Sequence, residues 1–218
     1  LLNGLSPVEV RGNSNIEVTG ITKDSRAVRK GFLYIATGKG SAYLRDALDR
    51  GADVLVTDDV RPETEFPCTI IVNQPEKWTG RLAARFYAFP SRDMHIAGVT
   101  GTNGKTTITF LIESILKCAG KKPGVIGTIT HRYAEHTIKA ENTTPGAVEI
   151  QALLNQMHTS GVTNVIMEVS SHALHQRRVE AVEYDVGIFT NLTHDHLDYH
   201  LNFENYKEAK KLLFGDYL

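Results

Sequence analysis

A glycine-rich loop between an apolar strand and a helix is the part of the sequence with the clearest chemistry. Residues 96–100 are apolar, residues 101–107 read Gly-Thr-Asn-Gly-Lys-Thr-Thr, and an amphipathic helix follows. Backbone N–H groups of such a loop, together with the positive end of the helix dipole, form a binding site for phosphate groups. Lys105 would then reach the terminal phosphates of a nucleotide, and the Thr106 hydroxyl would bind Mg²⁺. The motif therefore predicts a site for a nucleotide with Mg²⁺.

The loop departs from the strict phosphate-loop pattern at one position. Val99 stands where that pattern has a glycine, and Gly101 supplies the tight turn instead. The alternative is a plain glycine turn between a strand and a helix, with no ligand. We favour the phosphate site because the strand, the loop donors and the helix occur together. The predicted nucleotide-binding residues are Gly101, Thr102, Asn103, Gly104, Lys105, Thr106 and Thr107.

Two further polar motifs follow apolar segments. Glu168 ends the apolar run 164–169, where a carboxylate is costly to bury without a cation, so we interpret it as a Mg²⁺ ligand. The alternative is that Glu168 caps the following turn. The segment 193–200 is rich in His and Asp, but its spacing does not fit a zinc site. One histidine of this segment in the Mg²⁺ shell is the better interpretation, and we expect others to cap the helix that begins near residue 203.

Lys210 lies on that last predicted helix, between Lys207 and Lys211. Spacing alone does not show which of the three lysines has a function. A helix face of solvated basic side chains is the usual interpretation of such a cluster.

The pattern of strands and helices indicates an α/β protein with two domains. Residues 1–90 are expected to form a small mixed α/β domain with strands at 32–36, 54–56 and 69–72 and helices at 43–50 and 75–86. Residues 91–218 are expected to form part of a P-loop-type, mainly parallel α/β domain. Its predicted strands are 94–100, 124–127, 164–169 and 185–190, and its helices are 105–119, 145–160 and 203–214. Ligands bind at the carboxyl ends of such strands, where all three polar motifs fall.

Composition excludes several other classes of protein. The 218 residues carry a formal net charge of −1 and no long basic block, which argues against a general nucleic-acid partner. No apolar run approaches the about 20 residues that span a bilayer, and residues 1–7 do not resemble a secretory signal. The chain does not begin with Met, so we expect a trimmed start. Cys68 and Cys118 are expected to be buried free thiols of a reducing, cytoplasmic compartment.

The order of the motifs resembles that of the Mur ligases. The similar segments are 101–106, 142–145, 167–174 and 189–200, and the resemblance covers essentially the whole chain. Segments 170–174 and 195–200, and Asp-Ser-Arg at 24–26, are similar to the family members that add a diamino acid. The resemblance implies an ATP-dependent ligase of peptidoglycan precursor synthesis, with ATP and Mg²⁺ as cofactors. It would join L-lysine or meso-diaminopimelate to UDP-MurNAc-L-Ala-D-Glu through an acyl phosphate.

The resemblance also implies roles for single residues. Lys105, Lys210 and His196 match catalytic positions, and Lys210 matches a lysine that the family carbamylates. Thr106, Glu168, His196 and Lys210 match the Mg²⁺ environment. The positions that match contacts to the UDP-linked substrate, with Ser25 at the uridine, are Ser25, Asn142, Thr143, Thr144, Ser170, Gln176 and Arg178.

Three departures and two alternatives qualify the resemblance. His194 stands where the family commonly has Arg, the loop 37–42 is short, and the chain ends at Leu218 within the expected central domain. We therefore expect the C-terminal domain, which selects the amino acid, to be missing and this segment to be inactive alone. One alternative is a relative of the folylpolyglutamate or cyanophycin synthetase type, against which residues 24–26 and the first domain argue. The other is a non-catalytic nucleotide-binding relative.

Overall fold

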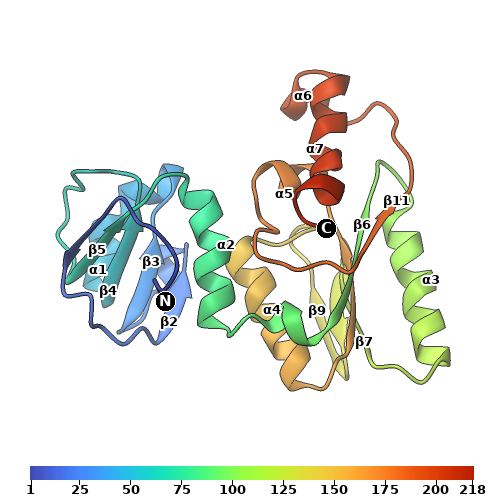
Figure 1. Cartoon of the computed structure of the whole chain (residues 1–218), viewed down its shortest axis with the longest axis horizontal. Coiled ribbons are helices and arrows are strands. Elements are labelled where there is room, and N and C mark those ends of the chain that lie inside the picture. Colours follow the sequence, from blue (N-terminus) through green and yellow to red (C-terminus); the bar gives the residue numbers. More distant parts are fainter. The chain divides into compact units, whose positions relative to one another are not determined.

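The computed structural model describes residues 1–218, and the chain divides into two compact units (Figure 1). Unit 1 is Leu1–Phe86 and unit 2 is Tyr87–Leu218, so the division falls slightly before the boundary expected after residue 90. The α/β class expected from the sequence is confirmed, because each unit contains one sheet whose strands are mostly parallel. No helix combines the length and the apolar character that crossing a bilayer requires.

Unit 1 is a five-stranded sheet with the strand order β1-β5-β4-β3-β2. Strand β1 pairs antiparallel with β5, and the other neighbours are parallel. The sequence predicted β3, β4, β5 and both helices, whereas it missed the short strands β1 and β2. The elements are β1 (Glu9–Gly12), β2 (Gly20–Thr22), β3 (Phe32–Ile35), α1 (Leu44–Asp49), β4 (Ala52–Thr57), β5 (Cys68–Ile71) and α2 (Pro75–Phe86), with 3-10 turns at Ser25–Ala27 and Gly38–Tyr43.

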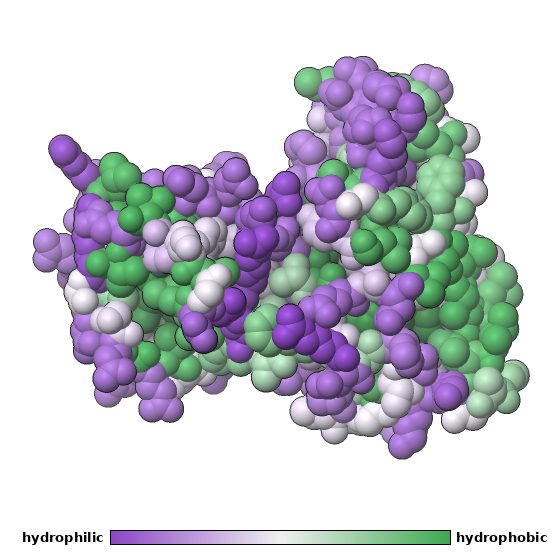
Figure 2. Space-filling model, viewed as in Figure 1, coloured by the Kyte–Doolittle hydropathy of each residue, from purple (hydrophilic) through white to green (hydrophobic).

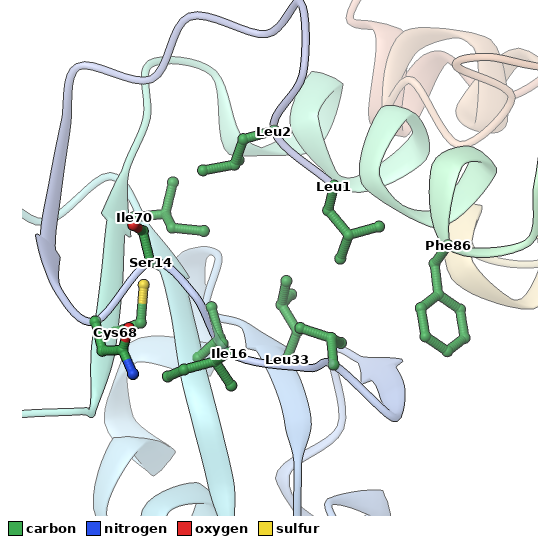
Figure 3. Close-up of a pocket in the computed structure, with 11 residues that line it drawn as sticks. Leu1, Leu2, Ser14, Ile16, Leu33, Cys68, Ile70 and Phe86 are labelled. Carbon is green, nitrogen blue, oxygen red and sulfur yellow. The ribbon is translucent and has the colours of Figure 1, made fainter.

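A cavity of about 620 Å³ opens in unit 1 beside the sheet (Figure 3). Side chains of Leu33, Cys68 and Ile70 from the sheet face it, together with Leu1 and Leu2 from the start of the chain and Phe86 from the end of α2. No charged side chain lines it, and Ser25, the predicted uridine contact, is not among its residues.

Unit 2 is a six-stranded sheet with the order β11-β6-β10-β7-β8-β9. Strands β11, β6, β10 and β7 are parallel, which confirms the expected arrangement, and β8 and β9 add an antiparallel hairpin that the sequence did not predict. The elements are β6 (His95–Thr100), α3 (Lys105–Cys118), β7 (Pro123–Ile126), β8 (Thr130–Tyr133), β9 (His136–Lys139), α4 (Ala147–Thr159), β10 (Asn164–Glu168), α5 (Ser171–His175), β11 (Val186–Phe189), α6 (Leu197–His200) and α7 (Phe203–Gly215), with a 3-10 turn at Pro90–Asp93.

The central strand β10 explains why unit 2 forms this sheet. Val165, Ile166 and Met167 are buried without alternation, as in a parallel strand covered on both faces. Helix α4 packs Ile150 and Leu154 into the main core, and α3 packs against the cluster that contains Ile166. The two covering helices therefore hold the strand ends, and the polar residues that follow them, in fixed positions.

Two local expectations need correction, and one helix is less buried than its apolar residues would allow. Cys68 is buried as expected, but Cys118 at the end of α3 is exposed. The side chain that caps α7 is Asn202, whose oxygen accepts from the Asn205 N–H at 2.8 Å, and not a residue of the segment 193–200. Helix α3 buries only part of its apolar surface, because Leu111 and Ile115 are exposed. Figure 2 accordingly shows a broad hydrophobic surface where α3 lies, on the right of the view.

We expect Leu154→Ala to lower the free energy of unfolding of unit 2 by about 3 kcal/mol, because it leaves a cavity in a fully buried core. Chemical denaturation followed by circular dichroism measures this change. Leu111→Ala on the exposed surface of α3 is the matched control, with an expected loss below about 1 kcal/mol. Equal losses in the two variants would contradict this assignment of the core.

Candidate functional site

The loop between β6 and α3 has the backbone conformation that its glycines permit. Gly101 has a φ of +145° and Gly104 a φ of +87°, both in the region that other residues rarely adopt. A Cβ at position 101 would also collide with Oγ1 of Thr190 and lie 3.0 Å from the backbone of Asn191. Gly101 therefore lets the end of β11 approach the loop closely.

Asn191 holds the loop against the end of β11. Its carbonyl oxygen accepts from the Thr102 N–H at 2.9 Å, and its side-chain oxygen accepts from the Asn103 N–H at 3.0 Å. These two N–H groups are thus already bonded within the protein, and only the other N–H groups of the expected anion site are open to a ligand. The first bond into α3 runs from the Ile108 N–H to the Gly104 oxygen, so the N–H groups of residues 105–107 have no partner within the helix. The start of α3 is the part of the motif that is open to phosphate.

Two lysines donate to the same carbonyl oxygen of the loop. Nζ of Lys105 lies 2.8 Å from the Gly101 oxygen and 3.0 Å from the Thr102 oxygen, and Nζ of Lys210 lies 2.9 Å from the Gly101 oxygen. Lys210 is buried, whereas Lys207 and Lys211 pair with Glu204 and Glu208 on the surface of α7. The structure thus separates the three lysines that spacing could not, and only Lys210 reaches the loop.

Burial and the neighbouring Lys105 charge lower the pKa of Lys210 to about 7, although Asp195 acts in the opposite direction. Burial also lowers the pKa of Lys105, an effect that Glu168 and Asp195 oppose. An uncharged amine has the lone pair that reacts with carbon dioxide to form a carbamate. The environment of Lys210 therefore fits the carbamylation that the family resemblance implies.

Glu168 places a buried carboxylate beside the loop. Its side chain accepts from Oγ1 of Thr106 at 2.9 Å and from Thr128, through Oγ1 at 2.9 Å and through N–H at 3.0 Å. Glu168 is 1% exposed and forms no salt bridge. A buried carboxylate without a paired cation, next to a threonine hydroxyl, is an oxygen donor set that suits Mg²⁺. The residues present therefore fit the predicted ion.

Thr128 is a residue that the sequence analysis missed. It follows β7, and the carboxyl end of that parallel strand lies at the same edge of the sheet as the ends of β6 and β10. The strand-end rule that singled out Glu168 would have found Thr128 too. Oγ1 of Thr128 also lies 3.2 Å from Oγ1 of Thr143, whose own hydroxyl can donate to it, which connects a predicted substrate residue to the carboxylate.

Four of the predicted substrate residues form one hydrogen-bonded group next to Glu168. Oγ1 of Thr144 donates to the Glu168 carbonyl oxygen at 2.8 Å and accepts from the Ser170 N–H at 3.0 Å. Arg178 donates through Nη1 to the Thr144 oxygen at 3.0 Å, and through Nε and Nη2 to Oε1 of Gln176 at 2.9 and 2.6 Å. Burial lowers the pKa of Arg178. The predicted phosphate and substrate residues thus meet at Glu168 and Thr144.

The other predicted residues lie less centrally. His196 is half exposed, and its backbone N–H donates to the Asp195 side chain at 2.9 Å. Its ring lies 4.7 Å from that of His172, and no contact joins it to Glu168 or Lys210. Asn142 and Thr107 are exposed. Ser25 belongs to unit 1, where it is buried in the turn that Asp24 caps.

The lowered pKa of Lys210 leads to a prediction about stability. The pKa is about 7 in the folded chain and near its ordinary value of 10.5 in the unfolded chain. Between these values the unfolded state binds the extra proton, so stability should rise with pH. We expect unfolding of unit 2 in metal-free, degassed buffer to become harder from about pH 7 to about pH 9. Lys210→Met should flatten this rise, and equal pH profiles would contradict the burial of a titrating amine.

Comparisons with known proteins place this geometry in a family. The family "Mur ligase middle domain" matches residues 99–217. The UDP-N-acetylmuramoyl-L-alanyl-D-glutamate–2,6-diaminopimelate ligase of Geobacter sulfurreducens is 43% identical over 97% of this chain and 42% of its own length. The ligase of the same name from Bacteroides thetaiotaomicron is 42% identical over 99% of this chain and 46% of its own length.

Solved structures agree with these relatives. A structure of a ligase with that name has a TM-score of 0.78 and 29% identity, and covers 90% of this chain and 41% of its own. MurF from Acinetobacter baumannii shares the fold, with a TM-score of 0.63, 18% identity, and coverage of 92% of this chain and 42% of its own. The chain thus spans less than half the length of these relatives. The chain belongs to the Mur ligase family.

Proposed function

We propose that this chain supplies the UDP-substrate unit and the phosphate-binding unit of an ATP-dependent ligase. The ligase adds a diamino acid to UDP-MurNAc-L-Ala-D-Glu in peptidoglycan precursor synthesis, in the cytoplasm where these substrates are made. Diaminopimelate, taken as the meso form that the family resemblance implies, is the preferred amine over L-lysine, because the relatives at 42% to 43% identity carry 2,6-diaminopimelate in their names. The observation that carries the proposal is the meeting of Lys105, Lys210 and Glu168 with the Thr144–Arg178 group at one sheet edge.

The reaction begins with an attack of one anion on another. The D-Glu side-chain carboxylate attacks the γ-phosphorus of ATP, the bond to ADP breaks, and an acyl phosphate forms. The carboxylate and the triphosphate repel each other, so positive groups must hold both in line. Lys105 can leave the loop carbonyls and donate to the phosphates, while the free N–H groups at the start of α3 receive them.

Thr106 and Glu168 are the residues that would hold Mg²⁺, with His196 and carbamylated Lys210 added by family resemblance. Bound there, the ion supplies positive charge to the phosphate oxygens. Thr128 fixes the orientation of the Glu168 carboxylate through two hydrogen bonds. In the second half of the reaction the amine of the diamino acid attacks the acyl carbon, and inorganic phosphate leaves with the bonding electrons.

The substrate end is assigned to the group around Arg178. The guanidinium is partly buried and would pair with a carboxylate of the peptide. Gln176, Ser170, Thr144, Thr143 and Asn142 complete this region, and Ser25 in unit 1 would contact the uridine.

The test measures ADP release and peptide-bond formation by the product of the gene that encodes this chain. We expect turnover only when ATP, UDP-MurNAc-L-Ala-D-Glu and meso-diaminopimelate are all present, with L-lysine as the competing amine. A rate of ATP hydrolysis that does not depend on the UDP-linked substrate would contradict the proposal. Calorimetry provides a second readout, because saturable binding of UDP-MurNAc-L-Ala-D-Glu but not of UDP-glucose or folate is expected.

Gly101→Ala should weaken nucleotide binding without unfolding the protein. The added Cβ would collide with Thr190, and the required φ is strained for alanine, so the loop must move away from Asn191. We expect the Kd for Mg·ATP, measured by calorimetry, to rise about tenfold or more. Gly215→Ala at the end of α7 is the matched control, because no atom lies near its added Cβ. Unchanged affinity in Gly101→Ala would remove this loop from the nucleotide site.

A further inference from the structure

Tyr199 is a polar residue of the site region to which no function has yet been given. It lies on the short helix α6, and its hydroxyl oxygen is 2.9 Å from Nδ1 of His175 and 3.0 Å from Nε2 of Gln176. Its ring packs at 4.2 Å, centroid to centroid, from that of His172. The Tyr199 hydroxyl thus joins α6 to the segment that carries two predicted substrate residues, Gln176 and Arg178.

The chemistry of the donors fixes the orientation of the Gln176 amide. Arg178 has only donor groups, and both Nε and Nη2 point at one side-chain atom of Gln176. That atom must be the oxygen Oε1, so the amide nitrogen Nε2 faces Tyr199 and donates to its hydroxyl oxygen. The hydroxyl proton is then available to Nδ1 of His175. In this series of hydrogen bonds, the neighbours of Gln176 and Tyr199 thus determine which of their atoms donate and which accept.

The backbone on both sides is held in unusual conformations that bring these groups together. Arg177, between Gln176 and Arg178, has a φ of 53°. His196 and Leu201, which flank α6, have φ values of 52° and 70°. Such values cost free energy for residues other than glycine and persist only where the surrounding structure imposes them. Three of the eight non-glycine residues with a positive φ thus lie in or beside the two segments that meet at the Tyr199 hydroxyl.

The arrangement leaves part of the Arg178 guanidinium for a ligand. A guanidinium has five N–H donors, and Nε, one N–H of Nη2 and one N–H of Nη1 are bonded to Gln176 and Thr144. The two remaining N–H groups belong to the two terminal nitrogens, the pair that binds a carboxylate in a forked geometry. If the Gln176 amide rotated, its NH₂ group would face the guanidinium and this orientation would be lost.

We propose that Tyr199 is a positioning residue for substrate binding. Its hydroxyl accepts from Gln176, keeps Oε1 of Gln176 on Arg178, and so holds the guanidinium ready for a carboxylate of the UDP-linked peptide. This role rests on the proposed function, because it takes that peptide as the ligand of Arg178. Tyr199 acts through Gln176 and does not itself bind the substrate.

The test compares the Tyr199→Phe variant with the wild-type gene product in the ligase assay. Removing the hydroxyl leaves Nε2 of Gln176 without its acceptor, so we expect KM for UDP-MurNAc-L-Ala-D-Glu to rise about three- to tenfold. We expect kcat and KM for ATP to change less than about twofold, since neither depends on Arg178. Tyr133→Phe is the matched control, because the Tyr133 hydroxyl donates to Gln156 outside the site, and its KM values should not change.

A double-mutant cycle separates positioning from general loosening of the fold. Arg178→Lys removes the planar fork, and in that background Tyr199→Phe should raise KM no further. Additive effects of the two substitutions would overturn the inference, as would equal changes in kcat and both KM values. If the wild-type protein is active and the Tyr199→Phe variant keeps its KM for the UDP-linked peptide, the inference is overturned while the proposed function stands. If the wild-type protein does not use the UDP-linked peptide as a substrate, the proposed function is overturned, and the inference is overturned with it.

Discussion

The buried carboxylate of Glu168 is the constraint around which the site of unit 2 is organised. Glu168 is 1% exposed and forms no salt bridge, so its carboxylate depends on hydrogen-bond donors from the protein in place of water. Thr106 from α3 and Thr128 after β7 supply them to its side chain, and Thr144 bonds its carbonyl oxygen. One residue at the end of the central strand thus ties together the phosphate loop, the neighbouring strand end and the substrate segment. The remaining capacity of its oxygens is what a hard cation would use.

Lys210, which is buried, and Lys105, which is partly buried, carry like charges in the same small region. Lys105 and Lys210 donate to a single carbonyl oxygen, and each ammonium makes the charge of the other less favourable. A folded protein keeps like charges together only at a cost in stability, which is common at sites that bind anions. The region is therefore prepared for negative charge, whether from phosphate oxygens or from a carbamate on Lys210, before any ligand arrives.

Sequence patterns predicted the elements that carry strong local signals. The apolar run before Gly101, the helix start at Lys105 and the unbroken burial of β10 all follow from residue type and period. The hairpin of β8 and β9 was missed because β9 is wholly exposed and so has no alternation to detect. Lys210 could not be separated from its neighbours because its burial depends on a loop distant in the sequence. The Tyr199 contacts were out of reach for the same reason.

The two glycines of the phosphate loop differ in what a side chain at each position would meet within the protein. At Gly104 no protein atom lies closer to an added Cβ than Thr190 Cβ at 4.0 Å, so within the protein it is the φ of +87° that favours glycine there. Gly101 is enclosed by backbone atoms of Asn191 as well as by Thr190, so a smaller residue at position 190 would not create the missing space. A side chain at position 101 would therefore displace the end of β11, whereas one at position 104 would act on the backbone conformation at the start of α3.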